Sequence, residues 1–196
     1  MRLKSALRRG VAAAVIAGIV VSSGIPAYAA RWDIADGNIT VKAGSTEGTN
    51  RVTQGEKKDV EDTDTVITGK SDKNTVTIKA ENENDKVEVK LEDVNIKTTG
   101  GKAAVSVTGK GDTNIELDGD NELKSGAGHA GLEYNKTDTS GELTIQDKDK
   151  NGSLDATGGF KGAGIGSAGS NDTQVKITGG NITATGEDWG AGIGSG

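Results

Sequence analysis

The sequence predicts an all-β fold, a right-handed parallel β-helix in which each coil takes about 26 to 33 residues. Two segments, "KGAGIGS" beginning at Lys161 and "WGAGIGS" beginning at Trp189, share six letters at a spacing of 28 residues. Short stretches such as "TVTIKA" and "QVKIT" place an apolar residue at every second position, which is the period of a half-buried strand. Repeats of roughly 20 to 50 residues that each hold one supersecondary unit are typical of solenoids.

Residues 1–29 have the features of a secretory signal peptide. Four basic residues precede an uncharged run, Val11 to Ile25, and the small-x-small sequence Ala27-Tyr28-Ala29 follows it. The run has 15 residues, fewer than the roughly 20 that a membrane-spanning helix needs. We therefore expect export with cleavage near Ala29, an extracellular or cell-surface location, and no membrane insertion once the peptide is removed.

Residues 30–80 are expected to form an N-terminal cap or irregular first coils. The segments "WDIADGNITVKAG" and "TVTIKA" are strand-like, but no clean period connects them. The charged run at 56–65, "EKKDVEDTDT", is expected to be a solvated loop.

Residues 81–196 are expected to form regular coils, because they contain four units in which two alternating segments precede a Gly- and Ala-rich third segment. The first-strand apolar residues are Val89, Ile115, Leu143 and Val175, and the third-segment residues are Val105, Leu132, Ile165 and Ile193. β-Branched residues and glycine dominate, and no apolar face recurs at helical spacing. We expect each set to stack in consecutive coils, with Ile165 beneath Ile193, and the glycines of the GAGIGS segments to permit close backbone approach.

The C-terminal end of the predicted stack is open. A β-helix needs a terminal cap that protects its last coil. Gly196 falls in the middle of a repeat. We therefore expect the chain to be truncated at its C-terminus and further repeats to stack on its last coil.

The composition excludes several classes of partner and site. Residues 1–29 hold four of the 23 basic residues and none of the 29 acidic ones, so the remainder has a net charge of about -10. An acidic surface argues against nucleic acid, anionic lipid and polyanionic glycans, unless a cation mediates the contact. The absence of cysteine excludes disulfides and thiolate metal sites.

Three segments make the chain similar to a known family. The opening "WDIADGNITV", the middle "VEVKLEDVNIKTTG" and the end "ITGGNITATGEDWGAGIGSG" resemble secreted gram-positive surface proteins with GAGIG-type parallel β-helix repeats, often described as carbohydrate-binding domain-containing proteins. The resemblance covers nearly all of residues 30–196, and its motifs are structural repeats. It implies a non-catalytic β-helix at the cell surface with polysaccharide and calcium binding.

The segment "DKDKNGS" is the strongest candidate for a metal site. Asp147, Asp149 and Asn151 occupy the first, third and fifth positions of a DxDxNG calcium loop. Position 12 is Gly158 instead of a bidentate glutamate, so the loop is not an EF-hand and its affinity for calcium would be modest. The alternative is a solvated charged turn. A weaker candidate one coil earlier consists of Asp118 and Asp120.

Trp189, Tyr134 and Phe160 are the candidate carbohydrate-binding residues. They lie near the same segment of successive coils, and Trp189 aligns with Lys161 when the two GAGIGS copies are superposed. Aromatic rings exposed on a β-helix face can stack on sugar rings and leave room for hydrogen bonds to hydroxyl groups. The alternative is that the rings fill gaps beside a glycine-rich backbone. Two acidic residues precede Trp189, which favours an exposed turn there.

The sequence offers little support for catalysis. The one histidine, His129, has no cysteine or second histidine with which to form a metal site. After residue 29 the only arginines are Arg31 and Arg51, outside the regular repeats, whereas β-helical lyases typically use an arginine base. A carboxylate pair for glycoside hydrolysis remains open. Clustering in one groove of Asp118, Asp120, Asp147 or Asp155 would favour it.

We expect a secreted, non-catalytic module that binds polysaccharide or mediates adhesion. Because the chain is acidic, it would prefer neutral glycans, or acidic ones through bound calcium. One alternative is a structural stalk or spacer of a surface adhesin, since solenoids gain length by repetition. The other is a divergent polysaccharide-degrading β-helix enzyme. An exposed aromatic strip would favour the binding module over both.

Overall fold

The computed structural model describes residues 28–135, 141–167 and 175–196. The predicted signal peptide lies outside the described residues except for Tyr28 and Ala29. Within the described ranges the only helix is a three-residue 3-10 turn, η1 (Ile34–Asp36), and none is long and apolar enough to cross a membrane. The strands are β1 (Tyr28–Asp33), β2 (Ile39–Ala43), β3 (Asn50–Gln54), β4 (Lys57–Ser71), β5 (Val76–Ala80), β6 (Lys86–Lys97), β7 (Val105–Gly109), β8 (Asp112–Asp118), β9 (Asp120–Lys124), β10 (Leu132–Asn135), β11 (Leu143–Gln146), β12 (Ser153–Phe160), β13 (Ile165–Ser167), β14 (Val175–Ile177), β15 (Asn181–Glu187) and β16 (Ile193–Ser195).

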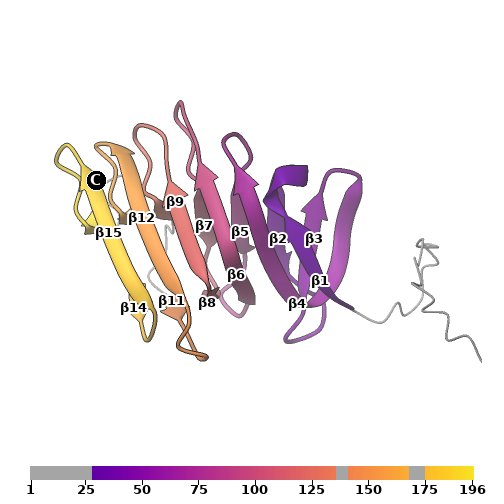
Figure 1. The fold of residues 1–196 in the computed structure, drawn as a ribbon. Coiled ribbons are helices and arrows are strands. Elements are labelled where there is room, and N and C mark those ends of the chain that lie inside the picture. Colours follow the sequence, from indigo (N-terminus) through magenta and orange to yellow (C-terminus); the bar gives the residue numbers. More distant parts are fainter. Residues whose placement is uncertain (1–27, 136–140, 168–174) are drawn as a thin grey trace, which may run out of the picture.

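The strands form one curled, mixed sheet that advances along the molecule in chain order, from the indigo N-terminal strands to the yellow C-terminal ones (Figure 1). Beyond β4 the paired strands run parallel, as in β5 with β7, β7 with β10 and β12 with β15. Each strand pairs with its counterpart in a neighbouring repeat. The hydrogen bonds of one repeat are therefore completed by the repeats on either side of it.

The third-segment residues stack as the sequence predicts. The ladder runs through Val105, Leu132, Ile165 and Ile193, each paired with the next. The two GAGIGS segments are consequently neighbours in β13 and β16. Gly166 has a φ of +144°, and a Cβ atom there would overlap the carbonyl oxygen of Gly194. The prediction that these glycines permit close backbone approach is confirmed at this position.

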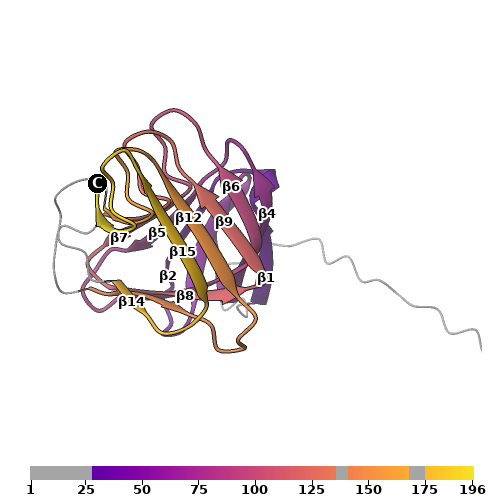
Figure 2. The same cartoon turned by 60° about the vertical axis from the view of Figure 1, so that its left-hand side comes forward.

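The core is a column of aliphatic side chains enclosed by the curled sheet, which Figure 2 shows from nearer its end. Along β8, buried and part-buried residues alternate at every second position. The large side chains buried in this column include Ile39, Ile67, Ile78, Leu91, Ile96, Ile115, Leu123, Leu132, Leu143 and Ile165. Because alternate residues of each strand point inward, the intervening polar residues form the outer surface on which ligands could bind.

The first repeats differ from the prediction in two ways. Strands β2, β3 and β4 pair antiparallel, so the sheet is mixed instead of purely parallel. The charged run at 56–65 lies mostly in β4, so its assignment as a loop is wrong. Pairing with β3 satisfies its backbone while most of its charged side chains remain in water. A strand with one solvated face can therefore have the composition of a loop.

One pairing in the first-strand set is shifted. Val89 pairs with Ile115 and Leu143 with Val175, as predicted, but Ile115 pairs with Ile145 instead of Leu143. A shift of two residues keeps the same face inward, because side chains alternate along a strand. Alternation alone therefore could not distinguish the two registers.

Candidate functional site

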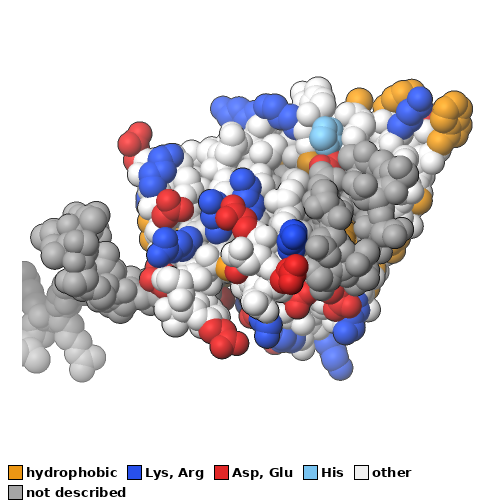
Figure 3. Space-filling view, turned by 180° about the vertical axis from the view of Figure 1, so that it is seen from behind, with side chains coloured by type: hydrophobic (Ala, Val, Ile, Leu, Met, Phe, Trp, Pro, Cys, Tyr) orange, Lys and Arg blue, Asp and Glu red, His pale blue; other side chains and the backbone are white. Residues whose placement is uncertain are grey.

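Phe160, Lys161 and Trp189 form an exposed cluster beyond the ends of β12 and β15, which we call the aromatic corner. Phe160 is 53% exposed and Trp189 is 91% exposed. The Nζ atom of Lys161 lies 5.3 Å from the centre of the Phe160 ring and 5.2 Å from that of Trp189, within cation–π range. Hydrophobic side chains and a basic one gather at the C-terminal end of the molecule, at the upper right of Figure 3. The corner thus offers two rings and a cation to solvent.

The backbone of the aromatic corner is strained. Lys161 and Trp189 have φ values of +59° and +83°, in the left-handed region that costs side chains with a Cβ about 1–2 kcal/mol. Gly128 of the preceding repeat, whose N–H donates to the carbonyl of Phe160 (2.9 Å), has a φ of +77°. Glycine would therefore satisfy this turn better than tryptophan. Local folding does not explain the ring of Trp189, and exposed residues held under strain cluster at functional sites.

Tyr134 does not belong to the aromatic corner, so the predicted carbohydrate-binding set is corrected to Trp189 and Phe160. Tyr134 is only 1% exposed, and its hydroxyl donates a hydrogen bond of 2.7 Å to the carbonyl of Gly141. It stands two residues after Leu132 in β10, on the inward face. Its ring fills the interior and cannot stack on a sugar.

The buried phenol of Tyr134 predicts alkaline sensitivity. Burial raises its pKa above the ordinary value of about 10, and the carboxylates of Asp112 and Glu142 raise it further. Because the folded pKa exceeds the unfolded one, the stabilisation is present below about pH 10 and is lost as the pH rises through the folded value.

We expect the free energy of unfolding, measured by urea denaturation between pH 8 and 11, to fall above about pH 10. Tyr134→Phe should flatten that fall. At pH 7 the same variant should lose about 1 kcal/mol, because the hydrogen bond to Gly141 is removed. Parallel pH profiles for the two proteins would contradict this account.

The connection between β11 and β12 contains the three predicted metal ligands. The Asp147 carboxylate accepts hydrogen bonds from the backbone N–H groups of Asn151 (3.2 Å) and Gly152 (3.1 Å). The Asn151 amide donates to the carboxylate of Asp118 in the preceding repeat (2.9 Å), and Asp149 is exposed. These hydrogen bonds account for the shape of the loop. No group of three His, Cys, Asp or Glu residues in the described ranges could hold a metal ion, and calcium binding stays a prediction.

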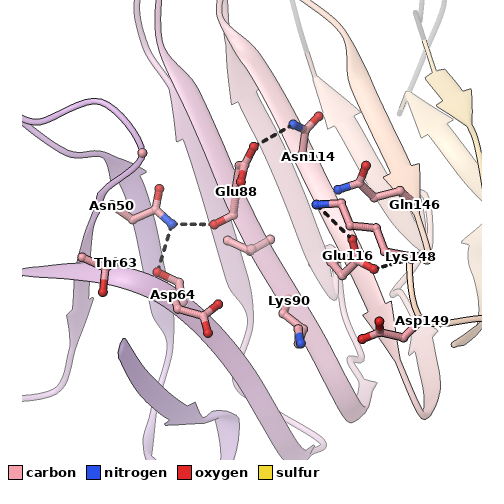
Figure 4. Close-up of a pocket in the computed structure, with 13 residues that line it drawn as sticks. Asn50, Thr63, Asp64, Glu88, Lys90, Asn114, Glu116, Gln146, Lys148 and Asp149 are labelled. Atoms are coloured by element: carbon pink, nitrogen blue, oxygen red, sulfur yellow. Dashed lines mark hydrogen bonds and ion pairs between the residues drawn. The ribbon is translucent and has the colours of Figure 1, made fainter. Parts of the chain in front are cut away.

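Outward-facing side chains of β4, β6, β8 and β11 line a groove of about 210 Å³, which we call the polar groove (Figure 4). The Asn114 amide donates to the carboxylate of Glu88 (3.2 Å) across adjacent strands. The backbone N–H of Lys148 donates to Glu116 (2.6 Å), whose other carboxylate oxygen lies 3.8 Å from the Lys148 ammonium. The polar groups of this groove are therefore largely occupied by one another.

A second groove of about 590 Å³, which we call the acidic groove, lies over β6, β9 and β12. It is lined by Lys70, Asp93, Asn95, Asp120, Asn121, Glu122, Ser153 and Asp155. Glu122 and Asp155 are direct neighbours on adjacent strands, and Lys97 lies 3.0 Å from Glu122. Of the four aspartates whose clustering would favour an enzyme, the groove brings together Asp120 and Asp155. The other two, Asp118 and Asp147, meet Asn151 in the β11–β12 connection.

Sequence analysis did not single out Lys161 or the lining of the two grooves. The alignment of Lys161 with Trp189, together with its position beside Phe160, is the signal that could have identified it. The groove residues occupy the polar positions of alternating strands, as most outward-facing residues do, so no pattern distinguishes them. His129 lies with its Nδ1 atom 2.6 Å from a carboxylate oxygen of Glu133, which is 2% exposed.

No protein-family model, curated protein or solved structure matches this chain. The functional interpretation therefore rests on the aromatic corner, the two grooves and the sequence itself.

Proposed function

We propose that the chain is an exported, non-catalytic module, a right-handed parallel β-helix whose aromatic corner binds polysaccharide at the cell surface. The observation that carries the proposal is Trp189, which is 91% exposed on a left-handed backbone where the preceding repeat has glycine. A ring kept at a site of strain and in contact with water is best explained by a ligand that covers it.

The surroundings of Trp189 suit a neutral glycan. Phe160 supplies a second ring on the neighbouring repeat, and Lys161 supplies hydrogen-bond donors between the two. Glu187 and Asp188 precede the tryptophan and add carboxylate oxygens that can accept hydrogen bonds from sugar hydroxyls. Because residues 30–196 carry a net charge of about -10, a polyanionic glycan would be repelled unless a cation such as calcium intervened.

The repeat architecture supports the β-helix part of the proposal. The parallel ladder from Val105 to Ile193 follows four consecutive repeats, and the column of aliphatic side chains lies inside the curl of the sheet. The antiparallel pairs of β2, β3 and β4 would then serve as the cap of the first coil.

Trp189→Gly should abolish binding without destabilising the fold. Glycine suits the left-handed turn, so the free energy of unfolding should stay unchanged or rise by about 1 kcal/mol, whereas the stacking surface is lost. We expect retention on a panel of insoluble polysaccharides, each tested with calcium and with chelator. The dissociation constant of Trp189→Gly on a retained neutral glycan should be at least tenfold weaker, which is about 1.4 kcal/mol.

Ile177→Ala is the matched control, because Ile177 is another exposed apolar residue, 39% exposed, away from the corner. Its affinity should equal that of the parent. Retention only with calcium, on an acidic glycan, would transfer the site to the Asp147 loop. Retention on no glycan would overturn polysaccharide binding and favour the structural stalk.

The acidic groove supports a second candidate, a polysaccharide-degrading enzyme. Glu122 and Asp155 stand side by side on adjacent strands, and glycoside hydrolysis needs two carboxyl groups roughly 5–10 Å apart. Release of reducing ends from a retained glycan, abolished by Asp155→Asn and preserved in Trp189→Gly at saturating glycan, would establish this function. Intact glycan after prolonged incubation would leave the binding module.

A further inference from the structure

Asp62 in β4 is a buried carboxylate without a cation. It is 0% exposed, and it forms no ion pair with a Lys, Arg or His of the described ranges. One carboxylate oxygen accepts a hydrogen bond of 2.7 Å from the indole N–H of Trp32. The other accepts from the backbone N–H groups of Ala30 (3.0 Å) and Asp64 (3.2 Å). A charge removed from water is costly unless it is both hydrogen-bonded and paired, and here the second requirement is not met.

The backbone nitrogen that Asp62 contacts belongs to the residue directly after the predicted cleavage site. Ala27 and Ala29 satisfy the small-x-small rule, which places the cut between Ala29 and Ala30. The regular parallel register of β1 with β4 also begins at Ala30, which pairs with Thr65, whereas a register shift separates it from Tyr28. The sequence motif and the hydrogen bond are independent observations, and they identify the same nitrogen atom.

We propose that export processing completes this site: cleavage before Ala30 creates an α-ammonium group that forms a buried ion pair with Asp62. Water hydrolyses the Ala29–Ala30 peptide bond, which a small-x-small-specific signal peptidase would catalyse. Ala29 leaves as a carboxylate, and the Ala30 nitrogen keeps its position and becomes a cation. The neutral N–H···O hydrogen bond of the precursor is thereby converted into a charge-assisted one, which is stronger.

The ion pair ties the stability of the first coil to processing. Trp32 is 2% exposed, lies under the Lys57 ammonium (5.2 Å from the ring centre), and shares Asp62 with Ala30. Before cleavage Asp62 has only neutral donors around it. After cleavage its counter-charge is present, so the first coil of the exported chain should be more stable than that of the precursor. This inference rests on the proposed export.

The first test identifies the processed terminus. The full chain is expressed in a secreting bacterial host, and the N-terminal residue of the secreted protein is determined by Edman degradation. We expect Ala30. Any other first residue would overturn the inference while leaving export in place, and retention of the uncut chain in the cytoplasm would overturn both.

The second test measures the ion pair through a double-mutant cycle. Chains that begin at Ala30 or at Tyr28 are each combined with Asp62 or Asp62→Asn, and urea unfolding is followed at pH 6.5 and 10. The Tyr28 chain is the matched control, because it keeps the Ala30 amide uncharged. At pH 6.5 we expect Asp62→Asn to lower the folding equilibrium constant about tenfold more in the Ala30 chain, equivalent to a shift of one pKa unit. The exposed neighbour substitution Asp64→Asn should show no such difference.

The sign of the pH effect follows from the cation. Pairing raises the pKa of an α-amino group above its unfolded value of about 7.7–8.0, so the added stability is present below that pH and disappears as the pH rises through the folded value. The excess stability of the Ala30 chain over the Tyr28 chain should therefore vanish by about pH 10. This comparison needs no Asp62 variant, so it holds even if Asp62→Asn does not fold. Equal stability of the two chains at pH 6.5, or an excess that persists at pH 10, would overturn the ion pair.

Discussion

Gly109→Ala is expected to cause the largest loss of stability, about 3–5 kcal/mol, by combining backbone strain with overpacking. Gly109 ends β7 with a φ of +103°, and a Cβ atom there would overlap the carbonyl oxygen of Ala80. That carbonyl accepts hydrogen bonds from the next two backbone N–H groups, of Lys110 (2.6 Å) and Gly111 (3.0 Å). The methyl group would have to push away the atom that holds the turn together.

Gly100→Ala is the matched control for Gly109→Ala. Gly100 also has a left-handed φ, +59°, but a Cβ atom there would meet nothing within 4 Å. Its substitution should cost only the conformational term, about 1–2 kcal/mol. Both free energies of unfolding are to be measured by urea denaturation at pH 7. Equal losses at the two positions would show that conformation, and not contact between coils, decides the requirement for glycine.

Leu132→Ala is expected to destabilise the chain by about 3–4 kcal/mol, within the range for a buried leucine whose surroundings cannot collapse. Leu132 is 0% exposed and lies between Val105 and Ile165 in the ladder. Rigid pairing of β10 with both neighbouring strands prevents the sheet from closing the cavity. The same urea measurement at pH 7 gives the loss.

Ile193→Ala tests the same ladder at its exposed end. Ile193 is 52% exposed and pairs with Ile165, so its removal should cost less than about 1 kcal/mol. A loss at Ile193 as large as that at Leu132 would contradict the view that enclosure by neighbours on both sides sets the cost.

The candidate site was predictable where the sequence repeats itself and unpredictable where it does not. The two GAGIGS copies aligned Trp189 with Lys161, and the structure brings these residues to adjacent repeats with 5.2 Å between ring centre and ammonium. Tyr134 was misassigned because an aromatic residue beside a glycine-rich segment can face either way. Only the side on which β10 places it, inward with Leu132, separates core from surface.

The Asp147 loop shows a different limit. A DxDxNG spacing specifies which oxygens lie close together along the chain, but not which N–H groups reach them first. In the fold, the backbone of Asn151 and Gly152 occupies the Asp147 carboxylate, and Asp118 of the preceding repeat receives the Asn151 amide. Contacts between repeats depend on register, which the local sequence does not encode.

Local patterns determine the all-β class, the inward and outward faces of the strands and the stacking of Ile165 with Ile193, because alternation and repetition are properties of the chain itself. Tertiary structure alone decides the register of Ile115 with Ile145, the antiparallel course of β2 to β4 and the approach of Asp62 to Ala30. Each of these joins residues about 30 positions apart. Several registers satisfy the same alternation, and the choice among them is made by the packing and hydrogen bonds of neighbouring repeats.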